Sequence, residues 1–182
     1  MSEHLAWAQW WAFPWKHALQ GWKDGKYPAI NALYRIGRSA PDDLTGIAAC
    51  LPPAPDPTVL RLVLATTEQL DLALTLVHDT FNPDATAPLS DSQHLWCTRL
   101  SKALPPAMLS PGADPLQLLH SWTGPETWQR LRLRFPRERV HKVEQNNASL
   151  ENASSRLNML WQAVVWRVTT PENDPMPPDS NG

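Results

Sequence analysis

Hydrophobic residues recur at helical spacing between positions 66 and 81, and this segment opens with the chemistry of a helix N-terminus. Thr66 and Gln69 fit a capping box, in which two side chains satisfy backbone N–H groups that the first helical turn leaves unpaired. The apolar positions follow the i, i+3, i+4, i+7, i+11 pattern of one helical stripe: Leu70, Ala73, Leu74, Val77 and Phe81. The turn residues at 82–84 end the predicted helix.

The same signals occur twice more along the chain. Ser90 and Gln93 predict a second capping box, and Pro105 ends the helix that follows it. The apolar stripe of this second helix comprises Trp96, Cys97, Leu100, Ala103 and Leu104. Asp114 followed by Pro115 predicts a third helix start, with a cap and a proline at the first helical position. Its inward-facing residues are predicted to be Leu116, Leu119 and Trp122.

The segment 123–140, TGPETWQRLRLRFPRERV, combines a helix start with an alternating arginine pattern. Thr123 and Glu126 predict a capping box around Pro125, and the helix is expected to end near Pro136, because a residue before proline avoids the helical region. Residues 130–135 also alternate with a period of two, which is typical of a strand. A helix is favoured over a short edge strand, because the rest of the sequence offers no obvious partner strand.

The clearest helical pattern is the last one in the chain, between residues 150 and 168. Its apolar positions are spaced by three, four and seven residues: Leu150, Ala153, Leu157, Leu160, Trp161, Val164 and Val168. The sequence that follows, TTPENDPMPPDSNG, is polar and rich in proline. It has too little apolar surface to offset the entropy of ordering it, so we expect residues 169–182 to form a flexible tail.

The first 56 residues carry weaker signals. They predict helices near residues 4–13, 28–37 and 42–51, the last capped by Asp42 or Pro41, with a loop through residues 23–25. Together with the later segments, they predict an all-α protein with a single compact domain of about seven or eight helices over residues 1–168. A Trp-rich segment at residues 1–25 opens that domain.

Composition indicates the cellular compartment in which this domain is expected. Proline accounts for 19 of 182 residues, about twice the average of roughly 5%, and most of the prolines separate predicted helices. Cys50 and Cys97 are the only cysteines, which favours free thiols in a reducing compartment, the cytoplasm. The first residues lack a basic region before an apolar core, so we expect no secretion signal. No uninterrupted apolar run reaches the about 18 residues of a membrane-spanning helix.

Basic charge is concentrated in one segment, although the formal net charge of the whole chain is −2. Six of the 16 Lys and Arg residues fall between positions 130 and 142: Arg130, Arg132, Arg134, Arg137, Arg139 and Lys142. Such a run is consistent with a solvated face, with a protein-binding patch, or with contact to nucleic acid or anionic lipid. Because the chain is not basic overall, an acidic or mixed-charge protein is a better candidate partner than a long nucleic acid.

Five of the ten tryptophans lie in the first 22 residues. Trp7, Trp10, Trp11 and Trp15 are spaced so that successive helical turns present indole rings on one side. Two interpretations stay open: the rings belong to the helical core, or they are anchors for a partner protein. These four tryptophans and the five arginines of the basic run, Arg130, Arg132, Arg134, Arg137 and Arg139, are therefore the candidate partner-binding residues.

Motifs for catalysis are missing from the sequence. It contains no P-loop, no G-x-G-x-x-G, no H-E-x-x-H, no C-x-x-C pair and no G-x-S-x-G. His94 and Cys97 share a predicted helix face and could supply two zinc ligands, but no second pair lies nearby. The favoured interpretation places Cys97 in the core and His94 at its edge. We therefore expect no enzyme activity, no cofactor and no metal.

Four segments resemble SctK, the K-component of bacterial type III secretion systems, in the short form found with Hrp-type systems. They are RLVLATTEQLDLALTLV at 61–77, LWCTRLSKAL at 95–104, LLHSWTGPETWQRLRLRFPRE at 118–138 and LNMLWQAVVWRV at 157–168. The resemblance covers roughly the last two thirds of the chain.

This resemblance implies a cytoplasmic, non-enzymatic accessory protein of the sorting platform. Such a protein links the cytoplasmic domain of an inner-membrane ring protein to the pod protein, and its membrane contact is indirect. Two other functions remain as alternatives: a nucleic-acid-binding regulator that uses residues 130–142, and a secretion chaperone.

Overall fold

The computed structural model describes residues 2–38, 40–146 and 154–170. Every regular element in these residues is a helix, either an α-helix (α) or a short 3-10 helix (η). The N-terminal elements are α1 (Glu3–Ala12), η1 (Pro14–His17), α2 (Gln20–Lys23), α3 (Tyr27–Arg35) and α4 (Asp42–Thr45). The later elements are α5 (Pro57–Leu64), α6 (Thr67–Phe81), α7 (Asp91–Ser101), η2 (Pro106–Met108), α8 (Leu116–Trp122), α9 (Pro125–Leu131), η3 (Arg132–Arg134), α10 (Arg137–Gln145) and α11 (Ser154–Thr169).

The all-α prediction is confirmed, and the described residues contain eleven α-helices where the sequence predicted seven or eight. The α-helices without a predicted counterpart are α2, which has only four residues and so gives no periodic pattern, α5 and α10. The predicted helix at 42–51 is wrong in length. It stops at Gly46, which adopts φ 67°, and residues 47–56 continue without helical structure.

The predicted helix starts have mixed outcomes. Both capping boxes at Thr66 and Ser90 are confirmed, with both reciprocal hydrogen bonds formed in each. The box predicted at Thr123 is wrong, because Gly124 occupies the N-cap of α9 and the Thr123 hydroxyl donates to the carbonyl of Leu119. An additional cap was not predicted: the Asp56 carboxylate accepts from the N–H groups that follow Pro57 and opens α5.

The segment 130–135 is helical, as favoured over a strand. It comprises the end of α9 and the 3-10 helix η3, and the chain turns extended at Phe135, just before Pro136. The separate helix α10 that follows was not predicted.

The predicted buried positions are largely confirmed. In α6 and α8 the stripe residues are buried apart from Phe81 and Trp122, which are half-buried, whereas Ala103 lies past the end of α7 and is exposed. In α11 the five predicted core residues within the helix are buried: Leu157, Leu160, Trp161, Val164 and Val168. The predicted core positions Leu150 and Ala153 lie outside the described residues. So does the predicted tail from residue 171 onward, whereas its first residue, Thr169, belongs to α11.

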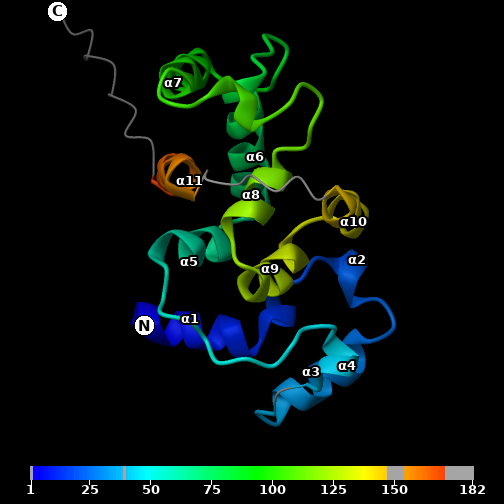
Figure 1. Ribbon diagram of the computed structural model, residues 1–182. Helices are drawn as coiled ribbons and strands as arrows, with labels where there is room; N and C mark the ends of the chain where they lie inside the picture. The colour runs from blue at the N-terminus through cyan, green and yellow to red at the C-terminus, as the bar shows by residue number, and fades with distance from the viewer. Residues whose placement is uncertain (1, 39, 147–153, 171–182) are drawn as a thin grey trace, which may run out of the picture.

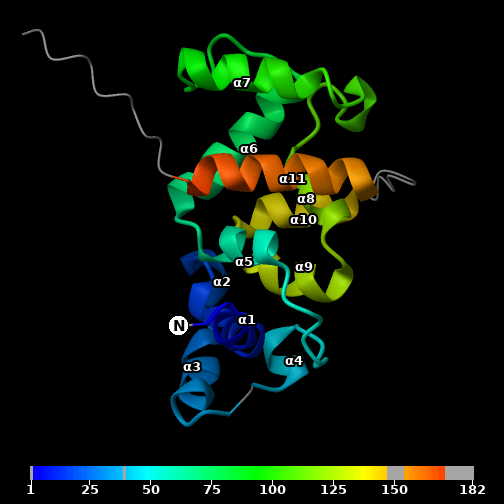
Figure 2. The ribbon, with the colours of Figure 1, turned by 90° about the vertical axis from the view of Figure 1, so that its left-hand side faces the viewer.

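The helices are stacked along the long direction of the molecule, with α7 at one end and α3 and α4 at the other (Figure 1). In the middle, α11 packs against α5, α6 and α8, and it runs parallel to the plane of view in Figure 2, where α1 is seen end-on. The main core surrounds α11. A smaller apolar cluster of Trp15, Ala18, Ile30, Tyr34, Ile47 and Leu133 packs the N-terminal elements against η3.

None of the helices in the described ranges has the length and apolar character needed to cross a lipid bilayer.

Candidate docking surface and ligand cavity

The four N-terminal tryptophans lie in the interior of the protein. Trp7, Trp10, Trp11 and Trp15 are between 1% and 4% exposed, and the first three rings contact one another with centroids 5.2–5.9 Å apart. The indole N–H groups of Trp7 and Trp11 donate to the carbonyls of Pro53 and Cys50 at 3.1 and 3.0 Å. Of the two interpretations of these four candidate partner-binding residues, burial therefore supports the helical core and not partner anchors. Trp7 and Trp11 also hold the non-helical segment 47–56 against α1.

Arg130 is buried as well, at 4% exposure, and so it is not a surface residue of the basic run. Its guanidinium donates to the carbonyls of Trp11 (3.2 Å), Glu126 (2.9 Å) and Ala48 (3.3 Å), and its Cζ lies 4.0 Å from the centre of the Trp11 ring. Burial lowers the pKa of Arg130, and nearby Cys50, Glu126 and Asp42 oppose that effect. Arg130 thus joins three segments that are far apart in the sequence.

Three other arginines of the run are half-buried and bond within the protein. Arg132 pairs with Glu144 at 2.9 Å and donates to the carbonyl of Gly46. Arg134 donates to the carbonyl of Ala65, and burial lowers its pKa. Arg139 holds both carboxylate oxygens of Asp114 at 2.6 and 2.8 Å. Most of the predicted basic run therefore serves internal contacts, and Arg137 is its exposed candidate.

The fold brings two lysines and a histidine of the N-terminal elements next to these arginines. Trp22 of α2 donates its indole N–H to the carbonyl of Phe135 at 2.8 Å, and the guanidinium carbons of Arg132 and Arg137 each lie 5.7 Å from its ring centre. Burial lowers the pKa of His17, and the charges of Arg134, Lys16 and Lys23 lower it further. We call the six residues Lys16, His17, Lys23, Arg132, Arg134 and Arg137 the basic surface. Sequence reasoning missed its first three members, because no local pattern relates residues 16–23 to residues 132–137.

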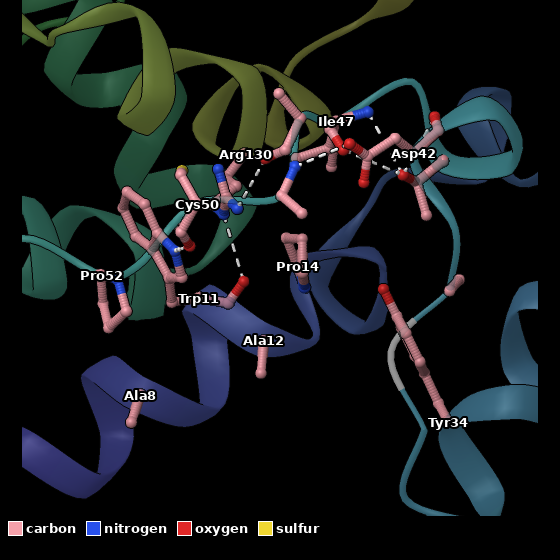
Figure 3. Close-up of a pocket in the computed structure, with 14 residues that line it drawn as sticks. Ala8, Trp11, Ala12, Pro14, Tyr34, Asp42, Ile47, Cys50, Pro52 and Arg130 are labelled. Carbon is pink, nitrogen blue, oxygen red and sulfur yellow. Dashed lines mark hydrogen bonds between the residues drawn. The ribbon is translucent and has the colours of Figure 1, made fainter.

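A second feature is a cavity of about 260 Å³ between α1, α3, the segment 40–52 and Arg130, which Figure 3 shows in close-up. Apolar side chains such as Trp11, Pro14 and Ile47 form much of its wall. Arg130 and Asp42 stand on different sides of it (Figure 3). The second oxygen of the Asp42 carboxylate, Oδ2, accepts from the backbone N–H of Ala49 at 2.9 Å. Tyr34 also lines the cavity, and burial raises its pKa to about 12, so its phenol stays neutral.

His94 and Cys97 adopt the arrangement that the sequence favoured. Cys97 is 1% exposed, and burial raises the pKa of its thiol to about 11. His94 lies at the edge of the core, where its Nδ1 is 3.0 Å from the buried carboxylate of Asp79. The described residues contain no group of three or more His, Cys, Asp and Glu side chains that could hold a metal ion. The buried Asp79 was not predicted, since its helix position lies on an otherwise apolar face.

Comparison of the chain with models of protein families, with curated proteins and with solved structures gave no match. Function is therefore argued from the basic surface and the cavity.

Proposed function

We propose that this protein is a non-enzymatic adaptor of a type III secretion apparatus. In this role it acts in the cytoplasm and links the cytoplasmic domain of an inner-membrane ring protein to the pod protein of the sorting platform. The proposal rests on the resemblance of four segments to SctK and on one structural observation, the basic surface. It belongs to the class of interaction proteins, for which a rigid helical scaffold and a charged docking face are sufficient.

The basic surface carries the proposal because it is assembled by the fold. Lys16 and Arg137 are exposed, Lys23 is half-buried, and they come from η1, α10 and α2. Among the three ion pairs of the described residues, only Arg132 with Glu144 involves this surface. Positive side chains that are not held in ion pairs attract an acidic partner and raise its rate of association. An acidic protein segment is the partner that this charge fits.

The segments that resemble SctK provide the scaffold for this surface. They correspond largely to α5, α6, α7, α8, α9, η3 and α11, and their apolar residues make up most of the main core. The basic surface lies where η3 and α10 meet the N-terminal elements. A docking face on a rigid body transmits force and position between two partners, which is what an adaptor requires.

A charge-reversal experiment tests the proposal. The variant Lys16→Glu, Lys23→Glu, Arg137→Glu changes the net charge by six, and the matched control Arg61→Glu, Arg99→Glu, Arg156→Glu changes it equally at exposed positions elsewhere. We expect the unmodified protein and the control to capture the ring domain or the pod protein in a pull-down. The first variant should bind at least about tenfold more weakly, since rim charges contribute on the order of 1 kcal/mol or more in combination.

Several results would count against the adaptor. Failure of the unmodified protein to bind either partner, together with intact secretion in a strain that lacks it, would remove the assignment. Salt-sensitive binding of an oligonucleotide, lost in the first variant, would favour the nucleic-acid regulator instead. Binding of one exported protein, with the apparatus still assembled in the deletion strain, would favour a chaperone.

A further inference from the structure

Arg130 places a positive charge at the wall of the cavity without forming an ion pair to a carboxylate of the described residues. Three of its five N–H donors reach the carbonyls of Trp11, Glu126 and Ala48. None of the three ion pairs in the described parts of the chain includes Arg130. The charge is thus offset at close range by carbonyl dipoles and by the face of Trp11, and at longer range by Glu126 and Asp42. A buried cation in this state gains from a further anionic partner, because Coulomb attraction is stronger where water is excluded.

The rest of the cavity is shaped for a small, largely apolar body. Its volume is about 260 Å³, and an apolar cavity of about 150 Å³ is enough to hold benzene. Trp11, Pro14 and Ile47 line it with apolar surface. Asp42, on another side (Figure 3), repels a negative group at that end. An anion would therefore place its charge toward Arg130 and its apolar part between the other walls.

We propose that this cavity binds a small monocarboxylate with a compact apolar body, whose carboxylate accepts hydrogen bonds from the guanidinium of Arg130. Charge-assisted hydrogen bonds of this kind are about twice as strong as neutral ones. The site goes beyond the adaptor function, does not involve the basic surface and does not depend on either secretion partner. Because the cavity is bounded by α1, the segment 40–52 and α9, a bound ligand also stabilises their association.

Benzoate, and benzamide as its neutral analogue of the same shape, are suitable probes for the full-length protein. Binding is measured by calorimetry and by the NMR shift of the Trp11 indole N–H. Substitution of Arg130 is unsuitable as the main test, because this side chain also holds the fold together. Ala12→Phe is better, since Ala12 is an exposed residue of α1 at the cavity wall. Gln9→Phe is the matched control, because it adds the same ring to α1 at an exposed position that does not line the cavity.

We expect benzoate to bind the unmodified protein with a Kd of about 1 mM or tighter, as a ligand of this size can. Benzamide should bind at least about tenfold more weakly, because it lacks the charge. Ala12→Phe should abolish benzoate binding, and Gln9→Phe should leave it within about twofold. The proposal is overturned if benzoate shows no saturable binding, if benzamide binds equally well, or if Ala12→Phe retains the affinity. These measurements are independent of the pull-down, so either proposal can fail while the other stands.

Discussion

Arg130 shows how a single side chain can connect parts of the chain that are more than eighty residues apart. The sequence presents Arg130, Arg132 and Arg134 as equivalent members of an alternating run. In the fold, Arg130 is buried against Trp11, whereas the other two are partly exposed. Nothing local distinguishes them, because the carbonyls that select Arg130 belong to Trp11 and Ala48. The sequence predicts that the arginines of this run are candidate binding residues. Which of them is buried and which is exposed depends on tertiary contacts.

Replacing Arg130 tests its structural role. Arg130→Met keeps much of the apolar stem and removes the guanidinium, so three carbonyls lose a donor and Trp11 loses a stacked cation. We expect the free energy of unfolding to fall by about 3 kcal/mol, since a hydrogen bond from a charged group contributes about 1.5–3 kcal/mol and the losses are not additive. Urea denaturation measures the change. Arg137→Met, at an exposed position, serves as the control and should cost less than about 0.5 kcal/mol.

The lowered pKa values of two histidines indicate how the stability of the protein depends on pH. Burial lowers the pKa of His17 and of His120 below the ordinary value of 6.5. The folded protein therefore binds fewer protons than the unfolded chain as the pH falls through 6.5. Acid then favours unfolding, so stability is fully present above that pH and decreases below it. For His120 the nearby Glu144 opposes the shift without reversing it.

The measurement is the urea midpoint between about pH 7.5 and 5.5. His120→Phe keeps an aromatic ring against Trp128, whose centroid lies 4.7 Å from that of His120, and removes the titrating group. Its midpoint should change less with pH than that of the unmodified protein. His4→Phe, at an exposed position of α1, is the control for replacing a histidine by phenylalanine. Equal pH dependence in His120→Phe and the unmodified protein would contradict the assignment.

At the scale of the helices, the sequence predicted a helix start correctly where the capping side chain bonds only to residues within one turn. The boxes at Thr66 and Ser90 need only residues three positions apart, and the fold preserves both. Thr123 has the same spacing to Glu126, but its hydroxyl is 3.0 Å from the carbonyl of Leu119, and Thr123 is only 7% exposed. The end of α8 therefore competes successfully for this side chain. The end of a preceding helix can thus accept the hydrogen bond of a predicted capping residue. The capping-box spacing alone does not reveal this competition.

Gln69 in α6 and Glu126 in α9 occupy the same position of a capping-box sequence, but their loss should change the free energy of unfolding by different amounts. The Gln69 side chain accepts from the backbone N–H of Thr66 and donates to the carbonyl of Val168 in α11. Gln69→Ala should therefore lower the free energy of unfolding by about 1–2 kcal/mol. Glu126→Ala removes a side chain that makes no capping bond in α9, and its cost should stay below about 0.5 kcal/mol. Thermal or urea unfolding compares the two, and equal costs would show that Glu126 caps α9 after all.

At the scale of the whole molecule, the N-terminal segment completes the core of the later helices. Trp7, Trp10 and Trp11 belong to the same apolar cluster as α5, α6 and α11. The backbone N–H of Leu19 donates to the carbonyl of Leu133 at 2.8 Å, and Trp22 bonds Phe135. The sequence predicted a tryptophan-rich helix here, but could not decide between core and interface. Whether the tryptophans are buried or exposed depends on the surface that the later helices offer to them. That surface is formed by residues far away in the sequence.

Removal of residues 1–25 tests this view of the whole molecule. The truncated chain would expose the apolar residues that face α1, and Arg130 would lose both the Trp11 carbonyl and the Trp11 ring. Because most domains are stable by only about 5–15 kcal/mol, the loss of several fully buried indole rings, each contributing about 3 kcal/mol or more, should abolish cooperative unfolding. Near-ultraviolet circular dichroism during heating measures this. Addition of a peptide of residues 1–25 in trans should restore part of the signal, whereas the same peptide with Trp10→Ala and Trp11→Ala should not. A truncated chain that unfolds cooperatively at the original temperature would show that the segment is peripheral, and the tryptophans would again be candidates for a partner surface.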